Sequence, residues 1–234
     1  MIKHASILIL TILLLNGTGF SQSELNLDQY HIVNPGQPYQ YMPVMHYQHA
    51  RKWYAEARYN YEDAETFSLY LGKAITGGKS LNYSIVPMLG GSVGRFQGVS
   101  TALNIDMDYH KFFFSSQSQY SRSTIQYGEY FLYSWSEIGY QGLKWLYAGL
   151  SVQHTYDRLA GNELQPGMMI GFTFNKFTIP VYTFDPFNNN GRNFVVGVTM
   201  SWKSQRKKQP AYPIVQSDQS LVDQAAPDID IITQ

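Results

Sequence analysis

Segments of about ten residues in which large apolar side chains alternate with small or polar ones recur through most of this chain. The last of them, residues 193–203, reads NFVVGVTMSWK. Its large apolar side chains fall at every second position: Phe194, Val196, Val198, Met200 and Trp202. Successive side chains of a β-strand point to opposite faces, so the pattern predicts strands with one apolar and one polar face rather than helices.

The first 21 residues, MIKHASILILTILLLNGTGFS, have the pattern of a secretory signal peptide. A basic residue, Lys3, precedes an apolar run over residues 5–15, and the small residues Gly19 and Ser21 stand at the spacing of a cleavage site. The run is shorter than the roughly 20 residues that a membrane-spanning helix needs. We therefore expect residues 1–21 to direct export and to be removed from the mature chain.

Composition excludes several classes of protein. The sequence contains no cysteine, which rules out disulfides, thiol catalysis, cysteine metal sites and a lipoprotein anchor. Lys and Arg together number 17, as do Asp and Glu, so the chain lacks the basic excess that nucleic-acid binding requires. After residue 22 no stretch approaches the roughly 18 consecutive apolar residues of a membrane-spanning helix.

The alternating segments between residues 51 and 203 predict about ten antiparallel strands, within a range of eight to twelve. In each segment the larger, more apolar face is expected to point outward. In the sixth segment that face carries Phe131, Tyr133 and Trp135, which alternate with Ser134 and Ser136. The chain has 19 tyrosines and 19 glycines, a composition that suits strands and tight turns.

The predicted connections alternate in length. Short ones lie at residues 109–111, 140–144 and 175–176, and longer ones rich in Gly, Asn, Ser or charge lie at 91–98, 121–128, 157–167 and 185–193. Outer-membrane barrels have short periplasmic turns and long external loops. The alternation therefore predicts a membrane barrel with both termini in the periplasm.

A soluble β-sandwich is the alternative fold, because its strands alternate in the same way and are separated by similar turns. Two features favour the barrel. Tyrosine and tryptophan gather towards strand ends, where aromatic girdles meet the membrane interfaces. The second face is mostly Ser, Thr, Gly, Asn, Gln and charged residues, which would make a poor sandwich core but suits a barrel interior.

The final strand resembles the C-terminal insertion signal of small bacterial outer-membrane β-barrel proteins. In that signal a glycine is followed three and five positions later by large apolar or aromatic residues, here Gly197, Met200 and Trp202. Val195 departs from the polar residue usual two places before the glycine, and residues 204–234 follow the signal. The resemblance, closest in style to Bacteroidetes-type barrels, covers residues 51–203. It implies a location in the outer membrane, contact with its lipid and insertion by the barrel-assembly machinery, but no specific activity.

Polar side chains from two predicted strands are expected to face the lumen: Glu56, Arg58, Asn60, Asn104, Asp106 and Asp108. One interpretation is a charged constriction that filters small solutes. The other is a buried polar network that plugs the lumen, since buried charges are normally paired. These interpretations correspond to a narrow pore and to a structural or accessory subunit of an envelope complex.

An outer-membrane enzyme, lipid A-modifying or protease-like, is the alternative function. It would place His154, Asp157, Asp63 and Asp185 near the external rim, where a histidine beside a carboxylate can act as a general base. Their spacing matches no catalytic pattern, so we predict no catalytic residues and no enzymatic activity.

A metal site was weighed at the histidines that precede residue 51. His46 and His49 are three residues apart, and His31 lies upstream. No carboxylate motif accompanies them, whereas zinc sites take three or four ligands. We therefore predict neither a metal nor a cofactor.

The regions that flank the predicted barrel are expected in the periplasm. Residues 22–50 contain prolines and tyrosines, and are expected to form a plug or an extended linker. Residues 204–234 are basic first and acidic afterwards, and are expected to be disordered. The basic start would meet lipid phosphates, and the apolar alternation of IDIITQ at the end would add a strand to a periplasmic protein partner.

Overall fold

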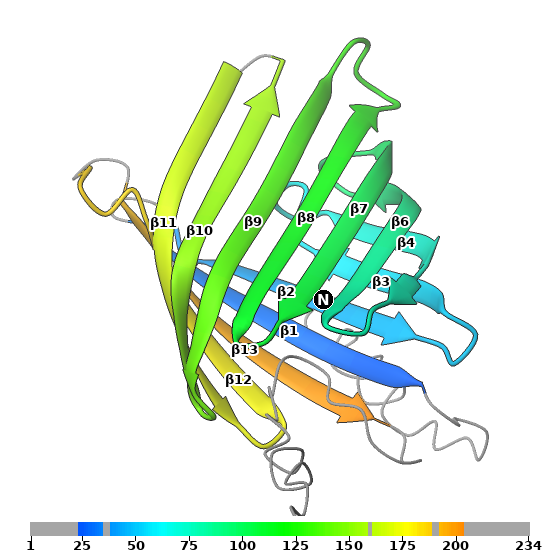
Figure 1. The fold of residues 1–234 in the computed structure, drawn as a ribbon. Helices are drawn as coiled ribbons and strands as arrows, with labels where there is room; N and C mark the ends of the chain where they lie inside the picture. Colours follow the sequence, from blue (N-terminus) through cyan, green and yellow to red (C-terminus); the bar gives the residue numbers. More distant parts are fainter. Residues whose placement is uncertain (1–22, 35–37, 159–160, 189–191, 204–234) are drawn as a thin grey trace, which may run out of the picture.

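The computed structural model describes residues 23–34, 38–158, 161–188 and 192–203 (Figure 1). The predicted signal peptide and the predicted tail, residues 204–234, lie outside these ranges. Every regular element within the described ranges is a strand. None of the described residues forms a helix long and apolar enough to cross a membrane.

The strands follow one another along the chain with short connections. Their bounds are β1 Glu24–Val33, β2 Gln40–Gln48, β3 Trp53–Tyr59, β4 Phe67–Lys73, β5 Ile75–Gly77, β6 Leu81–Val93, β7 Gly98–Tyr109, β8 Phe112–Ser123, β9 Tyr130–Leu143, β10 Leu146–Asp157, β11 Gly161–Phe174, β12 Phe177–Phe184 and β13 Asn193–Lys203.

Antiparallel pairing closes these strands into a ring. Strands that follow one another in sequence pair with each other except β4 and β5; in addition, β1 pairs with β13 and β4 pairs with β6. The short β5 follows β4 and pairs with the other end of β6, so the ring is a closed barrel of twelve strands. In Figure 1 strands β7–β11 form the near wall, and β13, β1 and β2 cross behind them at a large angle. The predicted all-β antiparallel barrel is confirmed, at the upper end of the predicted range of strands.

Two strands come from the segment predicted to precede the barrel. The prediction of a separate plug or linker at residues 22–50 is wrong, because β1 and β2 pair along their whole lengths as part of the wall. Pro43 lies within β2, opposite Gln29 of β1. A proline removes only one donor from a ladder, so one proline does not exclude a strand.

The two ends of the barrel differ in their connections. At one end, which we call the turn end, Glu24 pairs with Lys203 and the hairpins turn within two residues at 110–111, 144–145 and 175–176. At the opposite end, the loop end, lie connections 60–66, 94–97, 124–129 and 185–192. The predicted alternation holds except at residues 157–167, most of which belong to β11.

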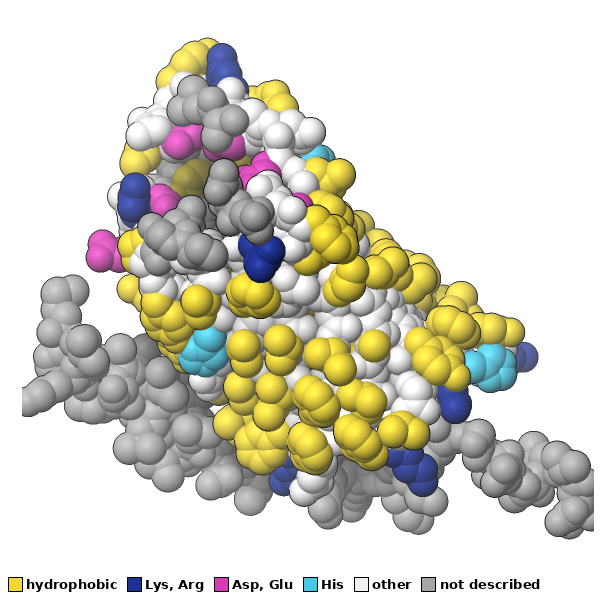
Figure 2. Space-filling model, turned by 90° about the vertical axis from the view of Figure 1, so that its left-hand side faces the viewer, with side chains coloured by type: hydrophobic (Ala, Val, Ile, Leu, Met, Phe, Trp, Pro, Cys, Tyr) yellow, Lys and Arg dark blue, Asp and Glu magenta, His cyan; other side chains and the backbone are white. Residues whose placement is uncertain are grey.

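The outer surface is strongly apolar (Figure 2). Large exposed side chains point away from the barrel on almost every strand, among them Leu69, Leu89 and Leu150. At the turn end they form an aromatic girdle: Trp53, Tyr109, Phe112, Tyr140, Trp145, Phe174 and Phe177. On β13 Phe194 and Val196 are exposed and Val195 is 1% exposed, so the predicted faces of this strand are observed.

The predicted faces of the sixth segment, now β9, are reversed. Trp135 is 5% exposed and packs inside the barrel against Tyr182 and Phe184, with ring centroids 5.0 and 5.7 Å away. Ser134 and Ser136 lie on the outer face, where their hydroxyls bond to serines of β8. Large aromatic side chains of β9 fill the interior at this point. The serine hydroxyls on its outer face form hydrogen bonds with one another, which lowers the cost of placing them towards lipid. The more apolar face of β9 is therefore the inner one.

Candidate functional site in the barrel lumen

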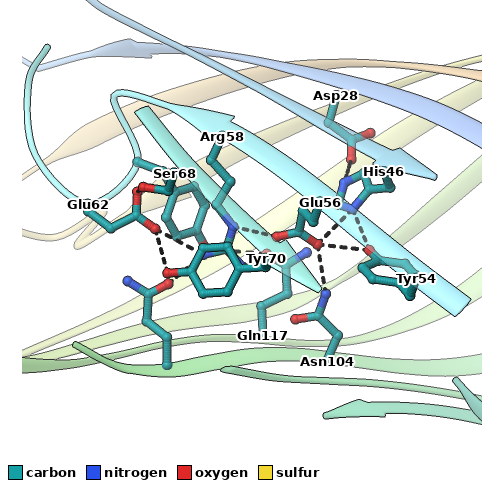
Figure 3. A network of polar contacts seen from close by, with 12 residues as sticks. Asp28, His46, Tyr54, Glu56, Arg58, Glu62, Ser68, Tyr70, Asn104 and Gln117 are labelled. Atoms are coloured by element: carbon teal, nitrogen blue, oxygen red, sulfur yellow. Dashed lines mark hydrogen bonds and ion pairs between the residues drawn. The ribbon is translucent and has the colours of Figure 1, made fainter. Parts of the chain in front are cut away.

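A network of charged side chains crosses the interior of the barrel (Figure 3). At its centre Glu56 of β3 is 1% exposed. Its Oε2 atom accepts from the Tyr54 hydroxyl at 2.8 Å and from Asn104 Nδ2 at 3.1 Å, and lies 2.9 Å from His46 Nδ1. Its Oε1 atom accepts from Arg58 Nε. Each carboxylate oxygen is therefore occupied, and β2, β3 and β7 are joined through one side chain.

One arm of the network leads to β1. The Nε2 atom of His46 lies 2.6 Å from Asp28 Oδ2, so the imidazole stands between two carboxylates. Both ring nitrogens donate only when the imidazole is protonated, and this geometry therefore suits an imidazolium. Sequence analysis considered this residue, His46, as a possible metal ligand. Its partners in the structure are carboxylates and Tyr54.

The other arm is built on Arg58, which is 2% exposed. Its guanidinium carbon lies 4.3 Å from the ring centroids of both Tyr61 and Tyr70, a double cation–π arrangement. Its Nη1 atom donates to Gln119 Oε1 of β8, across the lumen, and lies 3.5 Å from Glu62 Oε1. Arg58 thus links β3 to the opposite wall.

Two side chains of the connection between β3 and β4, residues 60–66, reach into the barrel: Tyr61 and Glu62. The Tyr61 hydroxyl donates to Gln117 Oε1 of β8 at 3.2 Å. The Glu62 side chain is 0% exposed and accepts from Ser68 and, at 2.8 Å, from Tyr70. The Tyr61 and Glu62 side chains narrow the lumen towards the loop end.

A cavity of about 360 Å³ occupies the other half of the lumen. It reaches from the turn end, at Gln48 and Lys176, to Tyr182 in the middle of the barrel, and no residue of the loop-end connections lines it. Above it the interior is filled by Arg58 and Tyr61 on one side and by Trp135 and Phe184 on the other. In this structure the cavity is therefore open at the turn end and closed towards the loop end.

The lining of the cavity is predominantly acidic. Its carboxylates are Glu24, Asp28, Asp106, Asp108 and Glu137, and its cationic or titratable basic groups are His46, Lys144 and Lys176. His46 is engaged with Asp28, and the two lysines stand in exposed turns at the mouth. Walls of one charge sign concentrate counter-ions in a cleft. The arrangement is suited to hold or pass cations.

The residues predicted to face the lumen occupy three different positions in the structure. Glu56, Arg58 and Asn104 are buried in the network, and Asp106 and Asp108 line the cavity. Asn60 is not among the residues that line the cavity. It has a positive φ of 58° in the turn after β3, where its Oδ1 accepts from the Glu65 backbone N–H at 2.7 Å. Asparagine tolerates this left-handed conformation better than most residues, which explains its position.

Three side chains of the network and cavity escaped sequence analysis, and a fourth, His46, was considered there only as a metal ligand; the three are Asp28, Glu62 and Glu137. Asp28 and His46 lie in the segment predicted to precede the barrel. Glu62 lies in a loop, and Glu137 lies on the reversed face of β9. Alternation in QYMPVMHYQ, which puts Met42, Val44 and His46 on one face, was the available signal for β2.

The rim residues considered for catalysis are not assembled into a site. His154 Nε2 lies 2.6 Å from Asn162 Oδ1, and Asp63 pairs with Arg95 at 3.2 Å. Among the described residues, the ion pairs between histidine and carboxylate are those of His46 inside the barrel. Nothing observed supports the enzyme alternative.

No protein-family model matches the sequence, and no curated protein sequence matches it either. Solved structures of small outer-membrane porins are similar in fold. A structure described as KdgM porin in complex with disordered oligogalacturonate has a TM-score of 0.55 and 13% identity, covering 76% of this chain and 99% of that one. The NanC porin has a TM-score of 0.54 and 8% identity, covering 75% and 98%. At such identities the likeness establishes the porin-type barrel fold.

Proposed function

We propose that this protein is an outer-membrane β-barrel that acts as a narrow, non-enzymatic pore with a constriction in the middle of its lumen. The observation that carries the proposal is the closed twelve-stranded barrel whose acidic cavity enters from the turn end and stops at the Arg58 network. A closed barrel pairs every strand edge, as hydrocarbon requires. Its exterior is apolar and its interior largely polar, as in outer-membrane barrels.

The turn end is proposed to face the periplasm, with both termini. Short turns lie there, and every lysine among the described residues does too: Lys52, Lys73, Lys79, Lys111, Lys144, Lys176 and Lys203. Next to the aromatic girdle these ammonium groups are placed to meet lipid phosphates. The insertion role of Gly197, Met200 and Trp202 and the binding of a periplasmic protein by residues 204–234 remain part of this proposal.

The orientation is testable because the chain has no cysteine. With single replacements Arg95→Cys in a loop and Lys111→Cys in a turn, a membrane-impermeant maleimide applied to intact cells is expected to label only Arg95→Cys. Permeabilising the outer membrane should then allow labelling of Lys111→Cys. The opposite order of labelling would place the turn end outside and contradict the proposed orientation.

The solute is proposed to differ from the oligogalacturonate named for KdgM. Oligogalacturonate is a polyanion, whereas the cavity of this chain carries an excess of carboxylates. Like charges in a low-dielectric cleft repel strongly. The proposal therefore favours cations or neutral solutes.

A structural or accessory barrel is the second candidate. It is favoured by one observation, the burial of large side chains between the cavity and the loop end, such as Phe184, which is 0% exposed. The two candidates separate in a planar bilayer. We expect the folded mature chain to give conductance steps whose reversal potential in a KCl gradient shows preference for K⁺ over Cl⁻. Preference for Cl⁻ would contradict the acidic filter, and silence from both this chain and a variant widened at Arg58 and Tyr61 would favour the structural role.

A further inference from the structure

The acidic cavity contains carboxylates that form no ion pair with a cation of the described residues. No ion pair of the described residues involves Asp106, Asp108 or Glu137. Asp106 accepts a hydrogen bond from the Ser115 hydroxyl at 2.9 Å. Carboxylates withdrawn from water are costly unless they are paired. The cavity thus supplies negative charge that a bound cation would balance.

Two amide groups add unused acceptors to the same wall. Asn104, which is 6% exposed, donates through Nδ2 to Glu56, and Asn26 donates through Nδ2 to Glu24 at 3.1 Å. These bonds fix the orientation of the amides. The Oδ1 atom of each is buried and has no hydrogen-bond partner among the described residues, although both side chains line the cavity. Buried acceptors without partners are uncommon and indicate a missing donor.

The remaining walls distinguish between kinds of cation. Aromatic side chains line the cavity together with the acceptors: Tyr30, Tyr54, Phe113, Phe114, Tyr147 and Tyr182. Aromatic faces attract organic cations and cover apolar carbon atoms. Within the described residues no group of three or more histidine, aspartate or glutamate side chains is placed to hold a metal ion. The lining therefore suits an ammonium or guanidinium compound with an apolar body better than a bare metal ion.

We propose that the cavity is a binding site for a small organic cation that bears an ammonium or guanidinium group. Asp106 and Glu137 supply the charge, the Oδ1 atoms of Asn26 and Asn104 accept its N–H donors, and the aromatic walls contact its carbon skeleton. The volume, about 360 Å³, lies within the roughly 300–1,000 Å³ typical of small-molecule sites. The role of this site in a pore rests on the proposed function. Binding of the cation is measured independently of conductance.

The test uses three five-carbon probes that differ in charge: cadaverine, 1,5-pentanediol and glutarate. Each is titrated calorimetrically into the full mature chain folded in detergent. We expect saturable binding of cadaverine and none of the diol or the diacid. In the variant Asp106→Asn/Glu137→Gln, whose side chains keep nearly the same shape, cadaverine affinity should fall about tenfold or more, which is about 1.4 kcal/mol or more.

Glu163→Gln is the matched control, because Glu163 is an exposed carboxylate near the loop end and outside the cavity. Its affinity for cadaverine should equal that of the unaltered chain. Circular dichroism confirms that each variant is folded. Equal binding of all three probes, absence of cadaverine binding, or an unchanged affinity in the folded double variant would overturn the inference.

Failure of the site and failure of the pore give different results. Saturable cadaverine binding by a barrel that never conducts would retain the cation site and remove the pore. Conductance without cadaverine binding would retain the pore and overturn the site.

Discussion

Replacing Glu56 with alanine is expected to lower the free energy of unfolding by about 3–5 kcal/mol, the range found when one partner of a buried ion pair is removed. Among the described residues, Arg58, 2% exposed, would then keep Glu62, at 3.5 Å, as its one anionic partner. His46 would lose one of its two carboxylates, and the Tyr54 hydroxyl would lose its acceptor. Denaturant unfolding of the barrel folded in lipid or detergent measures this change.

A matched carboxylate outside the network provides the control for Glu56→Ala. Glu163 is exposed, and its removal should change the free energy of unfolding by no more than about 0.5 kcal/mol. Replacing both charges, as in Glu56→Met/Arg58→Met, should cost less than Glu56→Ala, because it leaves no unpaired guanidinium. Equal losses for Glu56→Ala and Glu163→Ala would show that the network contributes nothing to stability.

The fold was largely predictable because alternation records the direction of each side chain in a strand. On β3 Tyr54, Glu56 and Arg58 share a face, and the structure places them inside. Alternation does not record which face is the lumen. Where Trp135 and its aromatic neighbours fill the interior, the larger face points inward and the prediction for β9 was wrong. The proline-containing β2 was overlooked for a related reason, since its inward face carries the apolar Met42 and Val44 beside His46 and is therefore not a polar face.

The candidate site was predictable only in part, because its residues come together only when the barrel closes. Glu56 and Arg58 are two residues apart, so their shared face follows from the strand period alone. Gln119, the partner of Arg58, comes from β8, and Asp28, which contacts Glu56 only through His46, comes from β1. Contacts between such distant strands require the register of every hairpin between them and the pairing of β1 with β13. The inward direction of Tyr61 and Glu62, which brings Glu62 to Arg58, lies in a connection without the alternation of a strand, so the sequence pattern could not predict it.

Opening the constriction is expected to produce the largest functional change. Arg58 and Tyr61 bond across the lumen to β8, Arg58 to Gln119 and Tyr61 to Gln117. In Arg58→Ala/Tyr61→Ala both connections to β8 are lost, and the acidic cavity should join the loop end. Conductance in planar bilayers should then rise severalfold over that of the unaltered chain, while the preference for K⁺ persists because Asp106, Asp108 and Glu137 are intact.

Tyr59→Ala is the matched control for this opening, since Tyr59 lies on the same strand and is 41% exposed on the outer surface. It removes a similar aromatic group without touching the lumen, so its conductance should equal that of the unaltered chain. A folded Arg58→Ala/Tyr61→Ala barrel that conducts no better than Tyr59→Ala would locate the barrier at Trp135, Tyr182 and Phe184 instead. In that case both the Arg58 network and the aromatic cluster would close the lumen. A structural role would then account for such a filled barrel better than a pore would.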